Sequence, residues 1–268
     1  MEVADMKRRK KKPYFESWYF REQAGDFTCA FTVLIDYDEE GRMTGHLDVA
    51  IPDGQRHLDY AHPVNMNLRG SLFLVLDKNV FTEACIHLDI DEPDLTIKGD
   101  IYFDRDFGGC RVGLRRNIWA MEQVLSGELT VNGREISFDG GKGYLEETRG
   151  LASAAPADTF RTQCNWFGDR SFRILCGADG DRCFAVIDQD GYPIRLAWWK
   201  GAKLEYLTRA GFRMRQRSYV LECWRSEETC ESCLDQTVRY RLTCKGDVLF
   251  DEISTRAGYT CDINSFES

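Results

Sequence analysis

Apolar and polar residues alternate along much of the chain, a pattern that predicts β-strands with one buried face. Residues 94–103 are typical, because Ile97 and Ile101 share one face while polar residues occupy the other. Residues 172–176 and 238–245 follow the same alternation. The sequence therefore predicts a chain built mainly from half-buried strands.

Short turn sequences separate these runs. Asn132 and Gly133 form a typical two-residue hairpin turn, and Asp-Gly and Lys-Gly pairs recur farther along the chain. Residues 117–125 and 226–235 are the best candidates for short helices. Many short antiparallel strands joined by tight turns predict an all-β barrel or sandwich, and 268 residues are enough for two β halves.

The charge balance excludes one class of function. With 35 Lys and Arg against 44 Asp and Glu, the net charge is −9, and a general nucleic-acid binder needs basic residues to neutralise phosphates. No run approaches the ~18 apolar residues of a membrane span. Residues 1–13 lack the apolar core of a secretory signal. We therefore expect a cytoplasmic protein.

A basic run, KRRKKK, lies near the start of the chain at residues 7–12. We expect residues 1–12 to form a disordered, solvated tail. The alternative is weak contact of Lys7 to Lys12 with RNA or with an anionic membrane surface, which would place the protein at the membrane periphery. No specific nucleic-acid contact is expected.

Eleven cysteines invite a disulfide interpretation, but the number is odd and a reducing compartment keeps thiols free. We expect most of them to be small buried apolar residues. Cys230 and Cys233 form a CxxC pair, with Cys223 and Cys244 nearby in sequence. A zinc site and a redox-active pair remain alternatives there. The favoured expectation is free thiols, with no metal and no cofactor.

Three segments stand out chemically. Aromatic residues surround a single carboxylate, Glu16, in YFESWYF at residues 14–20. Residues 140–147 are rich in glycine, which indicates a bend or a close backbone approach in a strand. In QCNWF, Gln163 and Asn165 share one strand face, and such amides inside an apolar barrel need partners from the protein or from a ligand.

These segments, in this order, carry a family resemblance. YFESWYF, FTEACIHLDI at residues 81–90, GELTVNGREISFDGGKGYLE at residues 127–146 and QCNWF at residues 163–167 resemble motifs of the tocopherol cyclase family, which is related to the carotenoid 1,2-hydratases. The resemblance implies two lipocalin-like antiparallel β-barrel or sandwich halves, residues 13–140 and 141–268, around an apolar ligand site. Family members act on prenylated quinols or polyenes by protonating an alkene and trapping the cation.

That chemistry needs a carboxylic acid kept protonated by apolar surroundings, with aromatic faces around the cation. The resemblance makes Glu146 and Glu16 the candidate proton donors. The alternatives are a surface position for Glu16, and for Glu146 a surface position or an internal ion pair. Four further residues are expected to line the site or orient ligand oxygens: Trp18, Tyr144, Gln163 and Asn165.

The chain also departs from the family pattern. Arg149 and Arg161 stand where the family has tryptophan, and Thr148 stands where it has an acidic residue. A guanidinium beside Glu146 favours the ionised carboxylate, which is a poor acid for an alkene. Arginine also binds carboxylates and phosphates through its planar fork. If Arg149 and Arg161 line the cavity, the ligand has an anionic head group; the alternative is that they pair with neighbouring carboxylates or point to solvent.

The segment before residue 127 departs as well, because Arg116 and Gln123 occupy positions at which family members commonly carry histidines. The leading hypothesis is a tocopherol-cyclase-like isomerase, an intramolecular lyase that binds a prenylquinol or another lipid-like molecule and cyclises or hydrates it. The alternative is a non-catalytic carrier or sensor of a hydrophobic ligand with an anionic head group.

Overall fold

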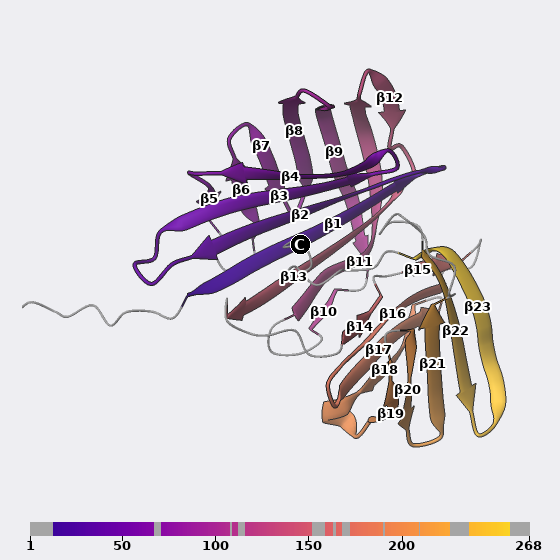
Figure 1. The fold of residues 1–268 in the computed structure, drawn as a ribbon. Coiled ribbons are helices and arrows are strands. Elements are labelled where there is room, and N and C mark those ends of the chain that lie inside the picture. Colours follow the sequence, from indigo (N-terminus) through magenta and orange to yellow (C-terminus); the bar gives the residue numbers. More distant parts are fainter. Residues whose placement is uncertain are drawn as a thin grey trace, which may run out of the picture.

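Antiparallel β-strands make up nearly all of the computed structural model, which confirms the all-β prediction (Figure 1). The structure describes residues 13–66, 71–107, 109–111, 116–151, 159–162, 165–167, 172–189, 191–208, 210–225 and 236–257. Within these ranges the one helix is the 3-10 turn η1 (Trp198–Lys200), so no described helix has the length and apolarity of a membrane span. The predicted tail, residues 1–12, lies outside the described residues.

A 13-stranded antiparallel sheet forms the first half of the molecule. The sheet curls so that its two wings enclose one apolar core, where Phe81 contacts the rings of Phe20 and Phe31 across the interior. In spatial order the strands are β4 (Gly54–Tyr60), β3 (Met43–Ile51), β2 (Phe27–Tyr37), β1 (Tyr14–Ala24), β13 (Lys142–Leu151), β11 (Arg116–Val131), β9 (Leu95–Phe107), β8 (Cys85–Glu92), β7 (Asn79–Thr82), β6 (Phe73–Leu76) and β5 (Val64–Asn65), with β10 (Cys110–Arg111) and β12 (Arg134–Ser137) paired to β11.

Two five-stranded antiparallel sheets form the second half. Their facing sides share one core, built around Phe212, Leu221 and Tyr240. The first sheet holds β14 (Thr159–Arg161), β15 (Asn165–Phe167), β16 (Phe172–Asp179), β17 (Arg182–Gln189) and β18 (Tyr192–Ala197). The second holds β19 (Lys203–Leu207), β20 (Gly211–Gln216), β21 (Tyr219–Arg225), β22 (Gln236–Cys244) and β23 (Asp247–Ala257).

The boundary between the halves differs from the expected division at residue 140. Strand β13 lies between β1 and β11 in the curled sheet, with Leu145 opposite Phe20, so it belongs to the first half. The boundary therefore falls after Leu151. The glycine-rich segment before β13 turns the chain back into the first sheet and does not lead into the second half.

The alternation pattern located strands well and located helices poorly. Residues 94–103 lie in β9, residues 172–176 in β16, and Asn132 and Gly133 form the expected turn with positive φ angles. The helix predicted at residues 117–125 is wrong, because this segment is the middle of β11. Strands β9 and β13 pair with it on both sides and satisfy its backbone groups. The other predicted helix, residues 226–235, lies outside the described residues.

The two halves meet through the outer face of the curled sheet. Tyr19, Met121 and Tyr144 from the first half pack against Leu175 and Val186 from β16 and β17. Strands β16 and β17 are therefore buried on both faces, one toward the core of the second half and one toward the first half. A chemistry-bearing side chain on β1, β11 or β13 consequently lies either inside the curled sheet or in this interface.

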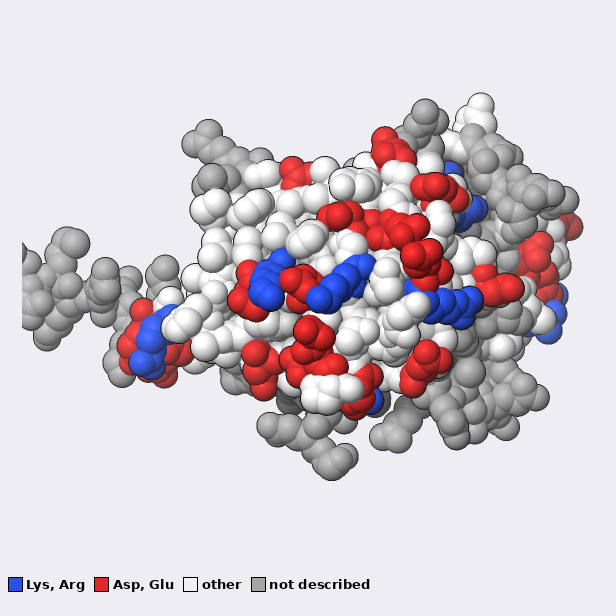
Figure 2. Space-filling view, turned by 90° about the horizontal axis from the view of Figure 1, so that it is seen from above, with Lys and Arg blue, Asp and Glu red and all other residues white. Residues whose placement is uncertain are grey.

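Charged side chains and cysteines can be located in the described part of the chain. On the face in Figure 2, acidic side chains lie interspersed with basic ones. Six described cysteines are free thiols: Cys29, Cys85, Cys176, Cys183, Cys223 and Cys244. The pair Cys230 and Cys233 lies outside the described residues.

Candidate functional site

A row of side chains crosses the inner face of the curled sheet at Glu22. Along β1, Trp18, Phe20 and Glu22 follow the period-two alternation and point inward, and all three have no exposed surface. Glu22 stands opposite Cys29 on β2 and opposite Gly143 on β13. The next strand, β11, places Gln123 opposite Gly143. We call Cys29, Glu22, Gly143 and Gln123 the Glu22 row.

The carboxyl group of Glu22 is buried without polar partners in the described part of the chain, which is unusual for a glutamate. Neither of its oxygens has a hydrogen-bond partner among the described residues. Burial raises the pKa of Glu22 well above its usual value, and the charge of Arg21 lowers it only in part. Arg21 is on the outer face of the sheet, where its guanidinium lies 5.4 Å from the ring centre of Trp166. The Glu22 site therefore favours the neutral carboxylic acid.

Gly143 makes room for this carboxyl group. A Cβ atom at this position would overlap Glu22 Oε2, would lie 2.8 Å from Leu125 Cδ2 and 3.3 Å from Gln123 Oε1. The side-chain amide of Gln123, which is 1% exposed, also has no hydrogen-bond partner among the described residues. Two buried polar groups thus approach the same glycine. The glycine-rich segment predicted a close approach to its backbone, and the group that approaches Gly143 is the side chain of Glu22.

Apolar groups surround the row. Leu125 and Phe31 belong to the same core as Cys29, and burial together with the nearby Glu22 raises the pKa of the Cys29 thiol. The indole Nε1 of Trp18 is a further buried donor that lacks a partner within the described part of the chain. The interior thus combines a neutral acid, an amide and an indole N–H with aromatic faces.

Glu146 lies on the opposite face of β13, in the interface between the halves, where it is 3% exposed. Arg116 Nε donates to Glu146 Oε2 at 3.0 Å, and Arg116 Nη2 and the Tyr144 hydroxyl bind the same oxygen. Burial lowers the pKa of Arg116, but Glu146 and Tyr144 raise it by more, so the net change is upward. The guanidinium also lies 5.3 Å from the ring centre of Phe184 on β17. Glu146 is therefore half of a buried ion pair.

The arginine that pairs with Glu146 is Arg116 and not Arg149. Arg149 Nε binds Glu147 Oε1 at 2.5 Å and lies 3.6 Å from Glu16 Oε1. About half of the Arg149 side chain, 52%, is exposed. Two carboxylates already balance its charge, so Arg149 offers no unpaired cation for an anionic head group.

Glu16 lies at the far end of β1 from Glu22. Asn65 Nδ2 donates to Glu16 Oε2 at 2.8 Å and to the Tyr37 hydroxyl at 2.7 Å. The Tyr14 and Tyr37 rings stack with centres 4.3 Å apart. Burial, with Glu16 next in importance, raises the pKa of Tyr37 to about 12. Glu16 is thus a largely buried carboxylate with hydrogen-bonding partners.

The remaining predicted residues are dispersed. Asn165 is in the second half, where its Nδ2 donates to the Tyr240 hydroxyl at 2.6 Å and its Oδ1 accepts from Ser254 Oγ at 3.1 Å. The side chain of Arg161 and the whole of Gln163 lie outside the described residues. Trp18 and Tyr144 are on opposite faces of the curled sheet, so the predicted residues do not line a single cavity.

A surface pocket of about 420 Å³ lies in the second half, away from all of these groups. It is lined by the turn residues Gly180 and Asp181 and by Leu204, Glu205, Tyr206 and Leu207. The candidate site is therefore the Glu22 row. The sequence singled out Gly143 and Gln123 of this row but not Glu22, whose one signal is that it continues the inward alternation of Trp18 and Phe20.

Comparisons with known proteins bear on the fold. No protein-family model matches the chain, and no curated protein matches it. Among solved structures it is similar to CghA with Sch210972, at 14% sequence identity over 92% of this chain and 86% of that chain, with a TM-score of 0.50. It is also similar to kievitone hydratase from Nectria haematococca, at 10% identity over 94% and 90% of the two chains, with a TM-score of 0.49. At 14% identity, the likeness to CghA shows the fold alone.

Proposed function

We propose that this chain is a tocopherol-cyclase-like enzyme that binds a prenylated or similarly lipid-like small molecule inside the curled sheet and protonates one of its alkenes. Glu22 is the proton donor. The observation that carries the proposal is a fully buried carboxyl group without hydrogen-bond partners among the described residues, inside an aromatic core where burial raises its pKa. The motif resemblance supplies the substrate class.

The chemistry follows from the surroundings of Glu22. The acid transfers its proton to the less substituted alkene carbon, and the new C–H bond leaves a tertiary cation on the other carbon. A phenol oxygen or a water molecule then bonds to the cation and returns a proton to the Glu22 carboxylate, which gives a cyclised or a hydrated product. Aromatic faces such as Phe20 and Phe31 attract the cation through their ring quadrupoles. An apolar interior also favours the reprotonation of Glu22.

The other two carboxylates are less suited to this step. Glu146 is ion-paired with Arg116, and Glu16 accepts a hydrogen bond from Asn65 and lies near Arg149. Both side chains already have polar partners, whereas Glu22 has none among the described residues. We therefore assign the role of proton donor to Glu22 and not to Glu146 or Glu16, the two candidates from the sequence.

Access to Glu22 requires movement. Because the side chain has no exposed surface, a ligand reaches it only when the neighbouring core side chains separate. We include this opening in the proposal. When the core side chains close again over the bound ligand, they exclude water during the reaction.

The alternative is a non-catalytic carrier or sensor of the same hydrophobic ligands. The ion pair between Arg116 and Glu146 favours the carrier, because Arg116 already occupies the carboxyl group that the motif resemblance indicates as the acid. Arg149 is already paired with Glu147 and lies near Glu16, so it gives little support to an anionic head group, and the side chain of Arg161 lies outside the described residues. A carrier would bind prenylated compounds and release them unchanged.

The test is turnover of a prenylated hydroquinone by the purified full chain in detergent micelles, with products separated by chromatography and identified by mass spectrometry. We expect Glu22→Gln to lower the rate about 100-fold or more, the usual contribution of a positioned acid, while ligand binding persists. Glu16→Gln is the matched control and is expected to retain turnover within a few-fold. Full activity in Glu22→Gln would contradict the assignment, whereas binding without turnover by the unmodified protein would establish the carrier.

A further inference from the structure

A short repeat lies on the outer face of the curled sheet. His46-Leu47-Asp48 on β3 and His57-Leu58-Asp59 on β4 pair antiparallel, with His46 opposite Asp59 and Asp48 opposite His57. Leu47 is fully buried on the inner face, so both histidines and both aspartates share the outer face. This cluster therefore lies on the opposite side of the sheet from the Glu22 row.

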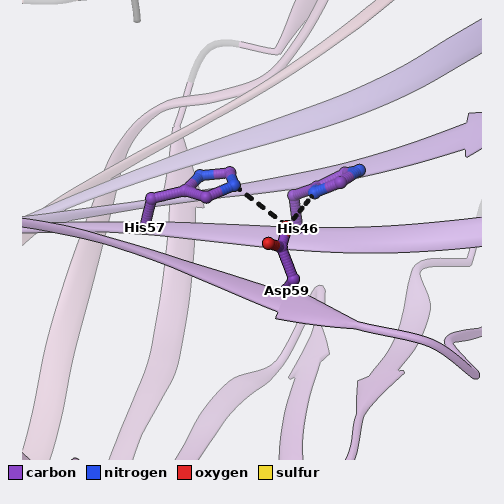
Figure 3. Close-up of side chains that lie close together, drawn as sticks. All are labelled: His46, His57 and Asp59. Carbon is purple, nitrogen blue, oxygen red and sulfur yellow. Dashed lines mark hydrogen bonds and ion pairs between the residues drawn. The ribbon is translucent and has the colours of Figure 1, made fainter.

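Three side chains of the repeat converge on one point (Figure 3). Asp59 Oδ1 lies 2.6 Å from His46 Nδ1 and 3.0 Å from His57 Nε2. One ligand atom from each of the three residues can be chosen so that all three lie within 4.8 Å of one another. The two imidazole rings stack with centres 5.5 Å apart, which holds both nitrogens toward the carboxylate.

Each histidine also has a carboxylate at its other ring nitrogen. His57 Nδ1 lies 2.6 Å from Asp48 Oδ1, and His46 Nε2 lies 3.5 Å from Asp36 Oδ2 on β2. Metal-binding histidines usually donate their second N–H to such a carboxylate, which fixes the tautomer and makes the ligating nitrogen more basic. The cluster thus contains the outer partners of a metal site as well as its ligands.

We propose that His46, His57 and Asp59 bind one divalent transition-metal ion, with zinc as the favoured ion. Two imidazole nitrogens and one carboxylate oxygen suit zinc and leave a fourth position for water or for a partner's ligand. Binding of the ion displaces any proton on His46 Nδ1 and His57 Nε2. Asp36 and Asp48 add negative charge around it, and Asp59, with 70% of its side chain exposed, keeps the site accessible.

The position of the cluster gives the ion a structural effect. Strand β4 is the end strand of the sheet order, so its outer edge is unpaired within the described residues. A metal bound by β3 and β4 together links the last strand to its neighbour through side chains as well as the backbone. A metal that binds the native state but not the unfolded chain raises stability further as its free concentration rises above the dissociation constant. We therefore expect zinc to raise the melting temperature of the full chain.

The test is calorimetric titration of the full chain with zinc chloride. It is done in a Cys230→Ser/Cys233→Ser background, because thiolates also bind zinc. We expect one equivalent to bind, with His46→Gln and His57→Gln each lowering the affinity about tenfold or more, and Asp48→Asn about 10–100-fold as an outer partner. Circular dichroism of each variant checks that it is folded.

The control is His87→Gln. His87 Nδ1 also contacts a carboxylate, Asp100 Oδ1, at 2.8 Å, but the described residues place no second histidine beside it. The proposal requires zinc affinity to be unchanged in this variant. It fails if His46→Gln and His57→Gln bind zinc as the unmodified protein does, or if His87→Gln loses affinity to the same extent. Asp59→Asn provides a second ligand variant if a histidine variant does not fold.

Discussion

Replacing Arg116 with methionine is expected to lower the free energy of unfolding by about 3–5 kcal/mol, the cost of leaving a buried charge without its partner. Arg116 is 7% exposed and Glu146 is 3% exposed, so neither group regains water when the other is removed. The guanidinium also packs on Phe184, so the substitution weakens the contact between the halves. Urea denaturation at neutral pH measures the change.

A double substitution separates the ion pair from packing. Arg116→Met combined with Glu146→Leu removes both charges, and we expect it to recover most of the lost stability, since apolar replacements of buried pairs are often neutral. Arg239→Met is the matched control. Its partner Asp251 forms a two-point contact at 2.7 Å on the exposed face of β22 and β23, so we expect a much smaller cost than for Arg116→Met. Equal costs for Arg116→Met and Arg239→Met would contradict the buried ion pair.

Replacing Glu22 with glutamine is expected to stabilise the protein increasingly as the pH rises. The raised pKa means that the folded protein keeps the Glu22 proton while the unfolded chain loses it above the usual value of about 4.3. Between these two pKa values the unfolded state binds fewer protons, so the stability of the unmodified protein falls as the pH increases. Glutamine has no proton to lose, so the variant avoids this cost.

The expected size is about 1.4 kcal/mol per pH unit from pH 5 upward, until the pH reaches the raised pKa of Glu22. Denaturation curves of both proteins at pH 5, 6, 7 and 8 give the difference. Glu135→Gln on the exposed strand β12 is the control, and we expect it to change stability by less than about 0.5 kcal/mol. A Glu22→Gln difference that stays constant with pH would show that Glu22 is ionised in the folded protein.

The sequence predicted the strands whose two faces differ. Residues 94–103 became β9, with Ile97 and Ile101 buried and Tyr102 exposed, as the alternation required. Strand β11 has no such contrast, because Met121 faces the second half while Leu125 faces the interior of the first. A strand buried on both faces has no alternating pattern, so a local reading could not distinguish it from a helix.

The site was harder to predict because it depends on register. The motifs located Glu146, but its partner Arg116 lies on β11 and meets it only through the pairing of β11 with β13. The motif resemblance likewise marked Arg116 and Gln123 as departures, but it could not show that their side chains lie on opposite faces of the curled sheet. Glu22 carried one visible signal, its phase with Trp18 and Phe20. Glu16 has the same phase, so this signal alone could not distinguish Glu22 from Glu16.

Measuring the protonation state of Glu22 in the folded protein is the most direct test of its proposed role as the proton donor. Carbon-13 NMR of side-chain carboxyl groups, recorded from pH 4 to 9 on the unmodified protein and on Glu22→Gln, follows this group alone, because its resonance is missing from the variant. We expect that resonance to remain in the protonated position at pH values where exposed glutamates are ionised, and to titrate well above the usual value of about 4.3. A midpoint at or below that value would contradict the neutral acid and, with it, the proposed proton donor.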